Sequence, residues 1–225
     1  LFFMMGLSIG VHLLNLLTIP AIVMVYFYRR YEVTTKSAIV AFITGCLITG
    51  LVQVGVIQYS MKAAGQFDVF FVNDLGMPFF SGFAIYFLLL AAVIGWALSF
   101  KEKAFNHTKL IIWFVAFLFL SALPFVIVPG DGLKFLPFIL IIGAAVAFGY
   151  FLKPSALRVI KLALWCYAFM MLGYFMYFTA IIRSTANPSI DMNNVDNPIS
   201  LVYYLSREQY GSAPLVYGPH FAASA

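Results

Sequence analysis

Four polar side chains recur at helical spacing within the apolar N-terminal segment. Ser8, His12, Asn15 and Thr18 are separated by four, three and three residues, so in one continuous α-helix they would share a face. Lipid cannot satisfy an imidazole or an amide, and this face is therefore expected to point into a helix bundle. It can supply hydrogen bonds between helices, worth about 0.6–2 kcal/mol each, or form the polar wall of a substrate cavity in which His12 contacts an anionic group. For His12 taken alone, the packing role is favoured.

Carboxylates and a guanidinium stand near the ends of apolar runs. Asp68 and Asp74 lie in the link 59–79, and Arg183 follows the last long apolar run. A guanidinium in that position can pair with a phosphate or contact lipid headgroups. Several other signatures are missing: a phosphate-binding glycine loop, HExxH, CxxC, GxSxG, and the run of intramembrane ionisable residues of a proton pump. No metal site is predicted.

The composition indicates a membrane protein. Of 225 residues, 64% are hydrophobic and 9% are charged, and the mean hydropathy is +0.99. A soluble domain has about 25% charged residues. The cations that give the net charge of +5 are scattered between apolar runs, as in loops beside membrane helices, which argues against a nucleic-acid partner. The expected fold class is an all-α polytopic membrane protein.

Apolar runs predict about six transmembrane helices, since roughly 20 apolar residues cross a hydrocarbon core of about 30 Å. The links after the first, third and fifth run carry nine of the 13 cations. By the positive-inside rule these links are cytoplasmic, and the tail faces outward, into the periplasm if the chain lies in a bacterial inner membrane. The predicted spans are 3–28, 37–58, 80–100, 110–128, 135–152 and 162–182.

Two segments outside the spans are expected to be helical. In the link 59–79, apolar side chains recur at helical spacing with polar residues between them, which predicts a short amphipathic helix lying in the outer interface. In the tail, Asn197 can cap a helix with Pro198 in its first turn, and Gly211 can close it. We therefore expect a membrane bundle over 1–183 and the start of an outward-facing soluble domain over 184–225.

Three stretches carry more information than apolar composition alone. They are residues 6–15 (GLSIGVHLLN), residues 70–79 (FFVNDLGMPF) with Ser81 and Gly82, and residues 182–188 (IRSTANP) leading to 204–218 (YLSREQYGSAPLVYG). Together they resemble a family of large multi-spanning proteins, common in the Bacteroidota, that includes an animal protein O-mannosyltransferase of the endoplasmic reticulum. The stretches between them resemble that family only in being apolar spans.

The resemblance implies a GT-C type glycosyltransferase, which passes a mannose-like sugar from a polyprenyl-phosphate donor to a protein hydroxyl on the outer face of the membrane. No further cofactor is implied. In that family an acidic residue of the first outer loop is catalytic, and this loop precedes the segment that matches Leu1. The catalytic residue is therefore expected upstream of Leu1, and both chain ends are expected to be cuts in a longer polypeptide. The candidates for donor contact are His12, Asn15, Asn73 and Arg183.

Two other functions stay open. A chain without the catalytic loop could be a non-catalytic membrane anchor or an assembly subunit, with other subunits of a membrane complex as partners besides the bilayer. A transporter or flippase component would have broken helices and charged residues near the membrane midplane; the sequence has the prolines but few such charges. An acidic first outer loop upstream would favour the transferase, whose partners are the lipid-linked donor and an acceptor protein.

Overall fold

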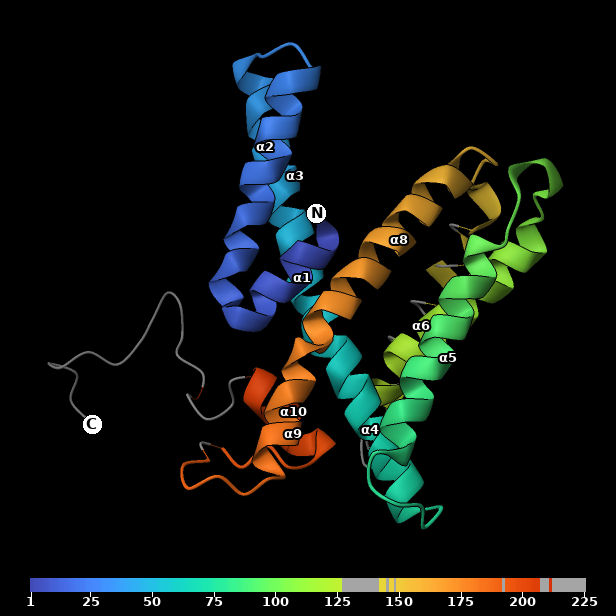
Figure 1. Cartoon of the computed structure of the whole chain (residues 1–225). Coiled ribbons are helices and arrows are strands. Elements are labelled where there is room, and N and C mark those ends of the chain that lie inside the picture. Colours follow the sequence, from blue (N-terminus) through green and yellow to red (C-terminus); the bar gives the residue numbers. More distant parts are fainter. Residues whose placement is uncertain (127–141, 145, 148, 192, 207–210, 212–225) are drawn as a thin grey trace, which may run out of the picture.

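The chain folds into helices and their connections throughout the residues that the structure describes. The computed structural model describes residues 1–126, 142–144, 146–147, 149–191, 193–206 and 211 (Figure 1). No strand occurs among these residues, which confirms the expected all-α membrane fold. The helices include α1 (Phe2–Val11), α2 (Thr18–Arg30), α3 (Thr35–Leu51), α4 (Ser60–Asn73), α5 (Ser81–Leu98), α6 (His107–Val126), α8 (Ala156–Tyr174), α9 (Phe178–Ser184) and α10 (Pro198–Ser206).

Four helical runs of the described residues are long and apolar enough to cross a membrane. They match the first, second, third and sixth predicted spans, and α6 corresponds to the fourth. Half of the fifth predicted span, 135–152, lies outside the described residues. The four runs are Leu13–Arg30, Thr35–Asn73, Ser81–Leu98 and Ala156–Ser184.

The structure differs from the single helix predicted over 3–28, because the chain is interrupted at His12. There the backbone is extended, with φ −154° and ψ 124°. A 3-10 segment (Leu13–Leu17) follows and leads into α2. Helix α2 then pairs with α3. The start of α3 is fixed by a reciprocal cap, in which the Ser37 N–H donates to Thr34 Oγ1 at 3.2 Å and the Thr34 N–H donates to Ser37 Oγ at 3.0 Å.

The link after the second span is not a separate helix. Helix α3 continues through a π-helical segment (Val52–Tyr59) into α4, so that one helical run extends over 39 residues, Thr35–Asn73. No proline occurs in this run, and α4 is held by packing against α5, α6 and α10. Helical hydrogen bonding therefore continues past the predicted boundary.

One polar residue of this segment, Asp68, is buried. Asp68, expected on the polar side, is 3% exposed, whereas Phe70 and Leu75 are 37% and 55% exposed. The Asp68 carboxylate accepts hydrogen bonds from the backbone N–H groups of Phe80, at 3.3 Å, and Phe83, at 3.2 Å. It thus caps the start of α5, where the dipole of the helix favours a negative charge. It also holds Phe80 in the left-handed region at φ 70°, a costly backbone conformation for a bulky residue.

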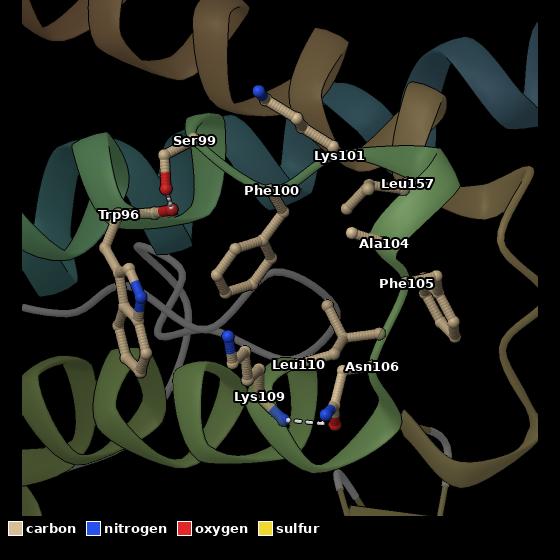
Figure 2. Close-up of a pocket in the computed structure, with 10 residues that line it drawn as sticks. All are labelled: Trp96, Ser99, Phe100, Lys101, Ala104, Phe105, Asn106, Lys109, Leu110 and Leu157. Atoms are coloured by element: carbon tan, nitrogen blue, oxygen red, sulfur yellow. Dashed lines mark hydrogen bonds between the residues drawn. The ribbon is translucent and has the colours of Figure 1, made fainter.

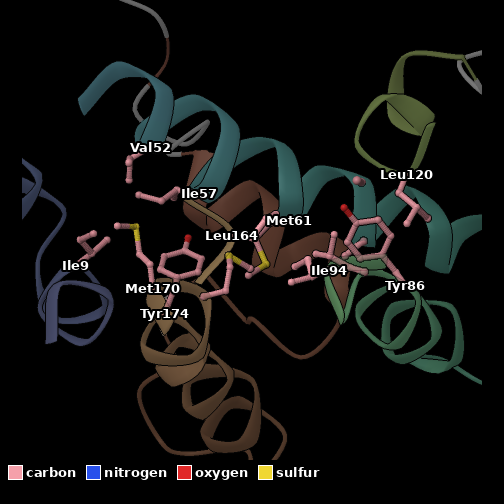
Figure 3. Close-up of a cluster of buried hydrophobic side chains, with 14 of the residues drawn as sticks. Ile9, Val52, Ile57, Met61, Tyr86, Ile94, Leu120, Leu164, Met170 and Tyr174 are labelled. Atoms are coloured by element: carbon pink, nitrogen blue, oxygen red, sulfur yellow. The ribbon is translucent and has the colours of Figure 1, made fainter. Parts of the chain in front are cut away.

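The core is formed where α8 crosses α1 and α4. Helices α1 and α8 touch backbone to backbone: a Cβ added at Gly6 would overlap the Met170 carbonyl oxygen, and one added at Gly173 would overlap that of Phe3. Figure 3 shows Tyr174 and Met170 of α8 lying between Ile9 of α1 and the helix that carries Val52, Ile57 and Met61. Small residues allow such close approach between membrane helices. A second cluster joins α5 to α9 through the rings of Phe83, Phe87, Phe175 and Phe178.

The predicted tail helix exists and packs on the membrane bundle. The Ser200 N–H donates to Asn197 Oδ1 at 2.8 Å, so Asn197 caps α10 as the sequence indicated. Leu201 is fully buried, and a Cβ added at Gly65 of α4 would lie 3.0 Å from Val202 Cγ2. Residues 198–206 therefore belong to the helix assembly, rather than to a unit separate from it.

The links between helices segregate by charge. The α2–α3 and α5–α6 connections and the start of α8 lie toward the upper end of the molecule in Figure 1, and lysines and arginines gather in these connections or in the helix turns that flank them. The α4–α5 turn and the connection from α9 to α10 lie toward the lower end. The alternation found in the sequence thus corresponds to two ends of one helix assembly.

At the lysine-rich end, Glu102 and Arg158 form an ion pair. Arg158 Nε and Nη2 donate to the two carboxylate oxygens, each at 3.0 Å. The hydrogen bonds from Arg158 lower the pKa of the Glu102 carboxyl. Because the pKa of the folded state is lowered, the stabilisation is complete above the ordinary carboxyl pKa and is lost as pH falls through the lowered value.

Replacement Glu102→Gln is expected to lower the thermal unfolding temperature only slightly at neutral pH, because both partners are exposed and water screens the pair. The difference from the unmodified chain should disappear at high salt or at acidic pH. Thermal unfolding in detergent, at two salt concentrations and two pH values, measures this. A difference that survives high salt would show that the pair acts through packing instead of charge.

Candidate functional site

The interruption after α1 gathers the polar residues of the first span. The Asn15 side-chain N–H donates to the Ser8 carbonyl oxygen at 2.6 Å, and the Thr18 hydroxyl donates to the Asn15 carbonyl oxygen at 2.7 Å. His12 Nδ1 accepts from the Leu14 N–H at 3.1 Å. These bonds replace helical hydrogen bonds that are lost at the break. The expectations of one shared helix face and of hydrogen bonds between helices are therefore wrong for these residues.

The break lies against the junction of α8 and α9. The Tyr177 hydroxyl donates to the Ile9 carbonyl oxygen at 3.2 Å, and a Cβ added at Gly10 would be 3.4 Å from Met176 Cβ. Tyr177 belongs to a short 3-10 segment (Phe175–Tyr177) between α8 and α9. His12 is exposed and Asn15 is half-buried. The imidazole Nε2 therefore remains open to a ligand, while Asn15 is partly used to hold the turn.

The connection from α9 to α10 is ordered by short polar contacts. The Ser184 hydroxyl, 3% exposed, donates to Asp191 Oδ2 at 2.6 Å. Asn187, Asn193 and Asn194 adopt left-handed backbone conformations, which asparagine tolerates better than other residues with a side chain beyond Cβ. Within the third resembling stretch, these contacts involve its first part, residues 182–188.

Arg183 projects from the end of α9, where its side chain is exposed. Among the described residues none forms a hydrogen bond or ion pair with its guanidinium. Arg183 is six residues beyond Tyr177, or about 9 Å along a helix. Helices α1 and α9 each contact the 3-10 segment Phe175–Tyr177, so the break with His12 and Asn15 and the helix that ends at Arg183 are joined through this segment.

Asn73 is not part of this group. It is exposed and lies in the last turn of α4, at the α4–α5 turn, which is next to the α5 start that Asp68 caps. Helix α4 packs on α5, α6 and α10, whereas the α1 break lies against the α8–α9 junction. The four predicted donor contacts therefore fall at two places of the fold.

Polar groups inside the bundle form a further set that the sequence analysis did not predict. The Ser60 and Tyr167 hydroxyls are 3.0 Å apart. The Tyr174 hydroxyl and Gln53 Oε1 are buried without a hydrogen-bond partner among the described residues, and Gln53 lies in the π-helical segment. Tyr167 and Tyr174 are seven residues apart, a spacing that places them on one helix face and could have revealed them.

The carboxylates near the lower end are mostly committed to the chain itself. Asp68 binds the start of α5, Asp191 accepts from Ser184, and Asp196 accepts from the Asn197 amide at 2.8 Å. Asp74 is exposed, and it makes no side-chain hydrogen bond to another described residue. Of these four, Asp74 alone keeps its carboxylate open to a substrate.

Comparison with known families gives a match at the N-terminal end of the chain. A model described as the Protein O-mannosyl-transferase TMEM260 N-terminal domain matches residues 1–35. No curated protein and no solved structure matches the chain. The matched segment contains α1, the break at His12 and α2, and the match supports a relation to that O-mannosyltransferase family.

Proposed function

We propose that the chain forms part of a GT-C type glycosyltransferase, which passes a mannose-like sugar from a polyprenyl-phosphate donor to a protein hydroxyl. The observation that carries the proposal is the family match over residues 1–35. This segment contains His12 and Asn15, which belong to the polar break beside the α8–α9 junction. The cationic Arg183 lies at the end of α9, which follows the 3-10 segment whose Tyr177 donates to Ile9, just before the break.

The reaction sets requirements that these residues meet in part. The acceptor oxygen attacks the anomeric carbon, the bond from that carbon to the phosphate oxygen breaks, and the phosphate leaves with the electron pair. A base must take the hydroxyl proton at about 2.6–3.2 Å, and donors must support the leaving phosphate. Arg183 and His12 are proposed to bind the phosphate. The base is proposed to come from the part of the enzyme upstream of Leu1.

An apolar groove between α5 and α8 supports a prenyl-linked donor. It has a volume of about 260 Å³ and opens between Leu90, Ile94, Met171 and Leu172. At one end it is lined by Phe175, which belongs to the same 3-10 segment as Tyr177. A chain lying in this groove would bring its phosphate toward the α1 break, and part of the prenyl chain is proposed to lie there.

The orientation is proposed from the charge of the links. The lysine-rich links gather at one end of the assembly, and such links stay cytoplasmic in most membrane proteins. The break, Arg183 and α10 would then belong to the outer side of the membrane, which is the periplasmic side of a bacterial inner membrane.

The direct test is sugar transfer by the intact polypeptide that contains this chain, in membranes supplied with polyprenyl-phosphate mannose and a serine- and threonine-containing acceptor peptide. Arg183→Ala is expected to lower kcat/KM about 10- to 100-fold. This is less than the loss of about 10²–10³-fold for a donor in a water-excluded site, because Arg183 is exposed. His12→Ala should lower it in the same direction.

Arg29→Ala serves as the matched control, since it removes an exposed cation from the opposite end of the assembly. It should leave transfer unchanged. If the intact polypeptide transfers no sugar, or if Arg183→Ala and Arg29→Ala behave alike, the chain has the anchoring role instead.

The interrupted first helix favours one other candidate, a flippase component, because discontinuous helices are common at the binding sites of transporters. In that case the intact polypeptide in proteoliposomes would move a lipid-linked sugar between leaflets without an acceptor. Transfer that requires the acceptor peptide would argue against it.

A further inference from the structure

A pocket of about 280 Å³ lies at the lysine-rich end, between the end of α5 and the start of α6 (Figure 2). Its apolar lining includes Phe100, Leu110 and Leu157, with Trp96 at one side. Figure 2 shows the Lys109 side chain rising from α6 toward the α5 side of the pocket. Lys101 lines the pocket from the α5–α6 link.

Two lysines line this pocket; Figure 2 shows Lys109 reaching into it, whereas the Lys101 side chain points away from the other lining residues. The nearest carboxylate in the sequence, Glu102, is bound on both oxygens by Arg158. Neither Lys101 nor Lys109 makes an ion pair with another described residue. Because Arg158 neutralises the adjacent carboxylate, the pocket keeps a local excess of positive charge.

Hydrogen-bond donors of the backbone add to this charge. The pocket is lined by Asn106, whose side-chain oxygen accepts from the Lys109 N–H at 3.2 Å and so caps α6. The remaining first-turn N–H groups of this 20-residue helix, and its dipole, favour an anion at its start. Lysine, a capped helix start and an apolar floor thus meet in one cavity.

We propose that this pocket binds the phosphate headgroup of an anionic phospholipid. The apolar floor and the exposed Trp96, which is 39% exposed, suit a ligand with both a phosphate and an apolar part, and tryptophan is enriched at the membrane interface. Basic pockets between membrane helices on the cytoplasmic side recognise anionic lipid headgroups. The pocket lies at the end of the assembly opposite Arg183, so its phosphate site is separate from the proposed donor-phosphate site, although the groove proposed for the prenyl chain reaches Leu98 beside it.

The test uses the intact polypeptide, purified in detergent and titrated with phosphatidylglycerol or phosphatidylcholine, with bound lipids counted by native mass spectrometry. Phosphatidylglycerol is expected to be retained in preference to phosphatidylcholine. The double variant Lys101→Gln/Lys109→Gln should weaken its binding about 30-fold, or about fivefold for each lysine. The charge-retaining variant Lys101→Arg/Lys109→Arg should restore most of the binding.

The matched control is Arg29→Gln/Lys36→Gln, which removes two cations from the same end of the assembly but from the last turn of α2 and the first turn of α3. It should leave lipid retention unchanged. Equal losses in both double variants would mean that only the overall charge matters, and the pocket would be rejected as a site. Displacement of the lipid by millimolar inorganic phosphate would also overturn the proposal, since the site would then be one for a soluble anion.

Discussion

Gly173→Ala is expected to destabilise the chain strongly, by about 3 kcal/mol. The added Cβ would overlap the Phe3 carbonyl oxygen and lie 2.7 Å from the Leu7 nitrogen. Overpacking costs about 1–3 kcal/mol when side chains can shift, but here both neighbours are backbone atoms of α1. The gain of up to about 1 kcal/mol in helix propensity from alanine does not offset this. Gly6→Ala should behave similarly, since its Cβ would meet the backbone of Met170 and Tyr174.

Gly95→Ala and Gly50→Ala are the controls for this prediction. Both glycines lie in helices, and a Cβ at either position would have open space around it. Thermal unfolding of the four variants in the same detergent separates the two classes. If Gly173→Ala unfolds at the same temperature as Gly95→Ala, the close crossing of α1 and α8 is not present in the folded protein.

The second large effect is expected at Asp68. Replacement by alanine removes the acceptor of two backbone N–H groups at a site that is 3% exposed. Each buried donor left unsatisfied costs about 1–3 kcal/mol, and Phe80 would lose the contact that holds its left-handed backbone. We expect the α4–α5 turn to open and the whole chain to unfold at a lower temperature. Asp68→Asn keeps one carbonyl oxygen as an acceptor and should lose about half as much.

Asp74→Asn is the matched control. It makes the same change as Asp68→Asn, but at an exposed position six residues further along the chain. It should leave thermal unfolding unchanged. Hydrogen exchange at the Phe80 and Phe83 amides gives a local readout, with faster exchange expected in Asp68→Ala and unaltered exchange in Asp74→Asn. Unaltered exchange in both would mean that the carboxylate does not cap α5.

The elements that the sequence predicted well depend on local rules. Asn197 and Pro198 mark the start of α10, and the structure has both the cap and the helix there. The apolar runs predicted the helices, because length and composition decide whether a segment can cross a bilayer with its backbone N–H and C=O groups hydrogen-bonded. Cation-rich links alternate with cation-poor links along the chain. In an antiparallel helix assembly every second link lies at the same end, so the cation-rich links gather at one end.

The missed features depend on contacts between distant or competing groups. The break at His12 follows Gly10 by two residues, but it is stabilised by the Asn15 amide, which donates to the Ser8 carbonyl oxygen, and residue spacing does not reveal that hydrogen bond. The burial of Asp68 depends on the approach of α5. A Cβ at Gly82 would be only 2.6 Å from the Asp68 Cα, so α5 covers Asp68, while Asn73 and Asp74 remain exposed. For the candidate site, the sequence indicated the polar residues, but it could not show that Asn73 lies away from His12, Asn15 and Arg183 in the fold.

The unbroken run from Thr35 to Asn73 also constrains how the molecule fits a bilayer. A helix of 39 residues is about 58 Å long, while the hydrocarbon core is about 30 Å thick. Even at a tilt of 40°, near the upper limit for membrane helices, it would extend about 44 Å along the bilayer normal. At least one end must therefore reach the headgroup layer or the water beyond it. In a thicker bilayer the lipid headgroups would lie closer to the α4–α5 turn. The distance from the turn to the headgroups would therefore depend on the hydrophobic mismatch between the helix and the bilayer.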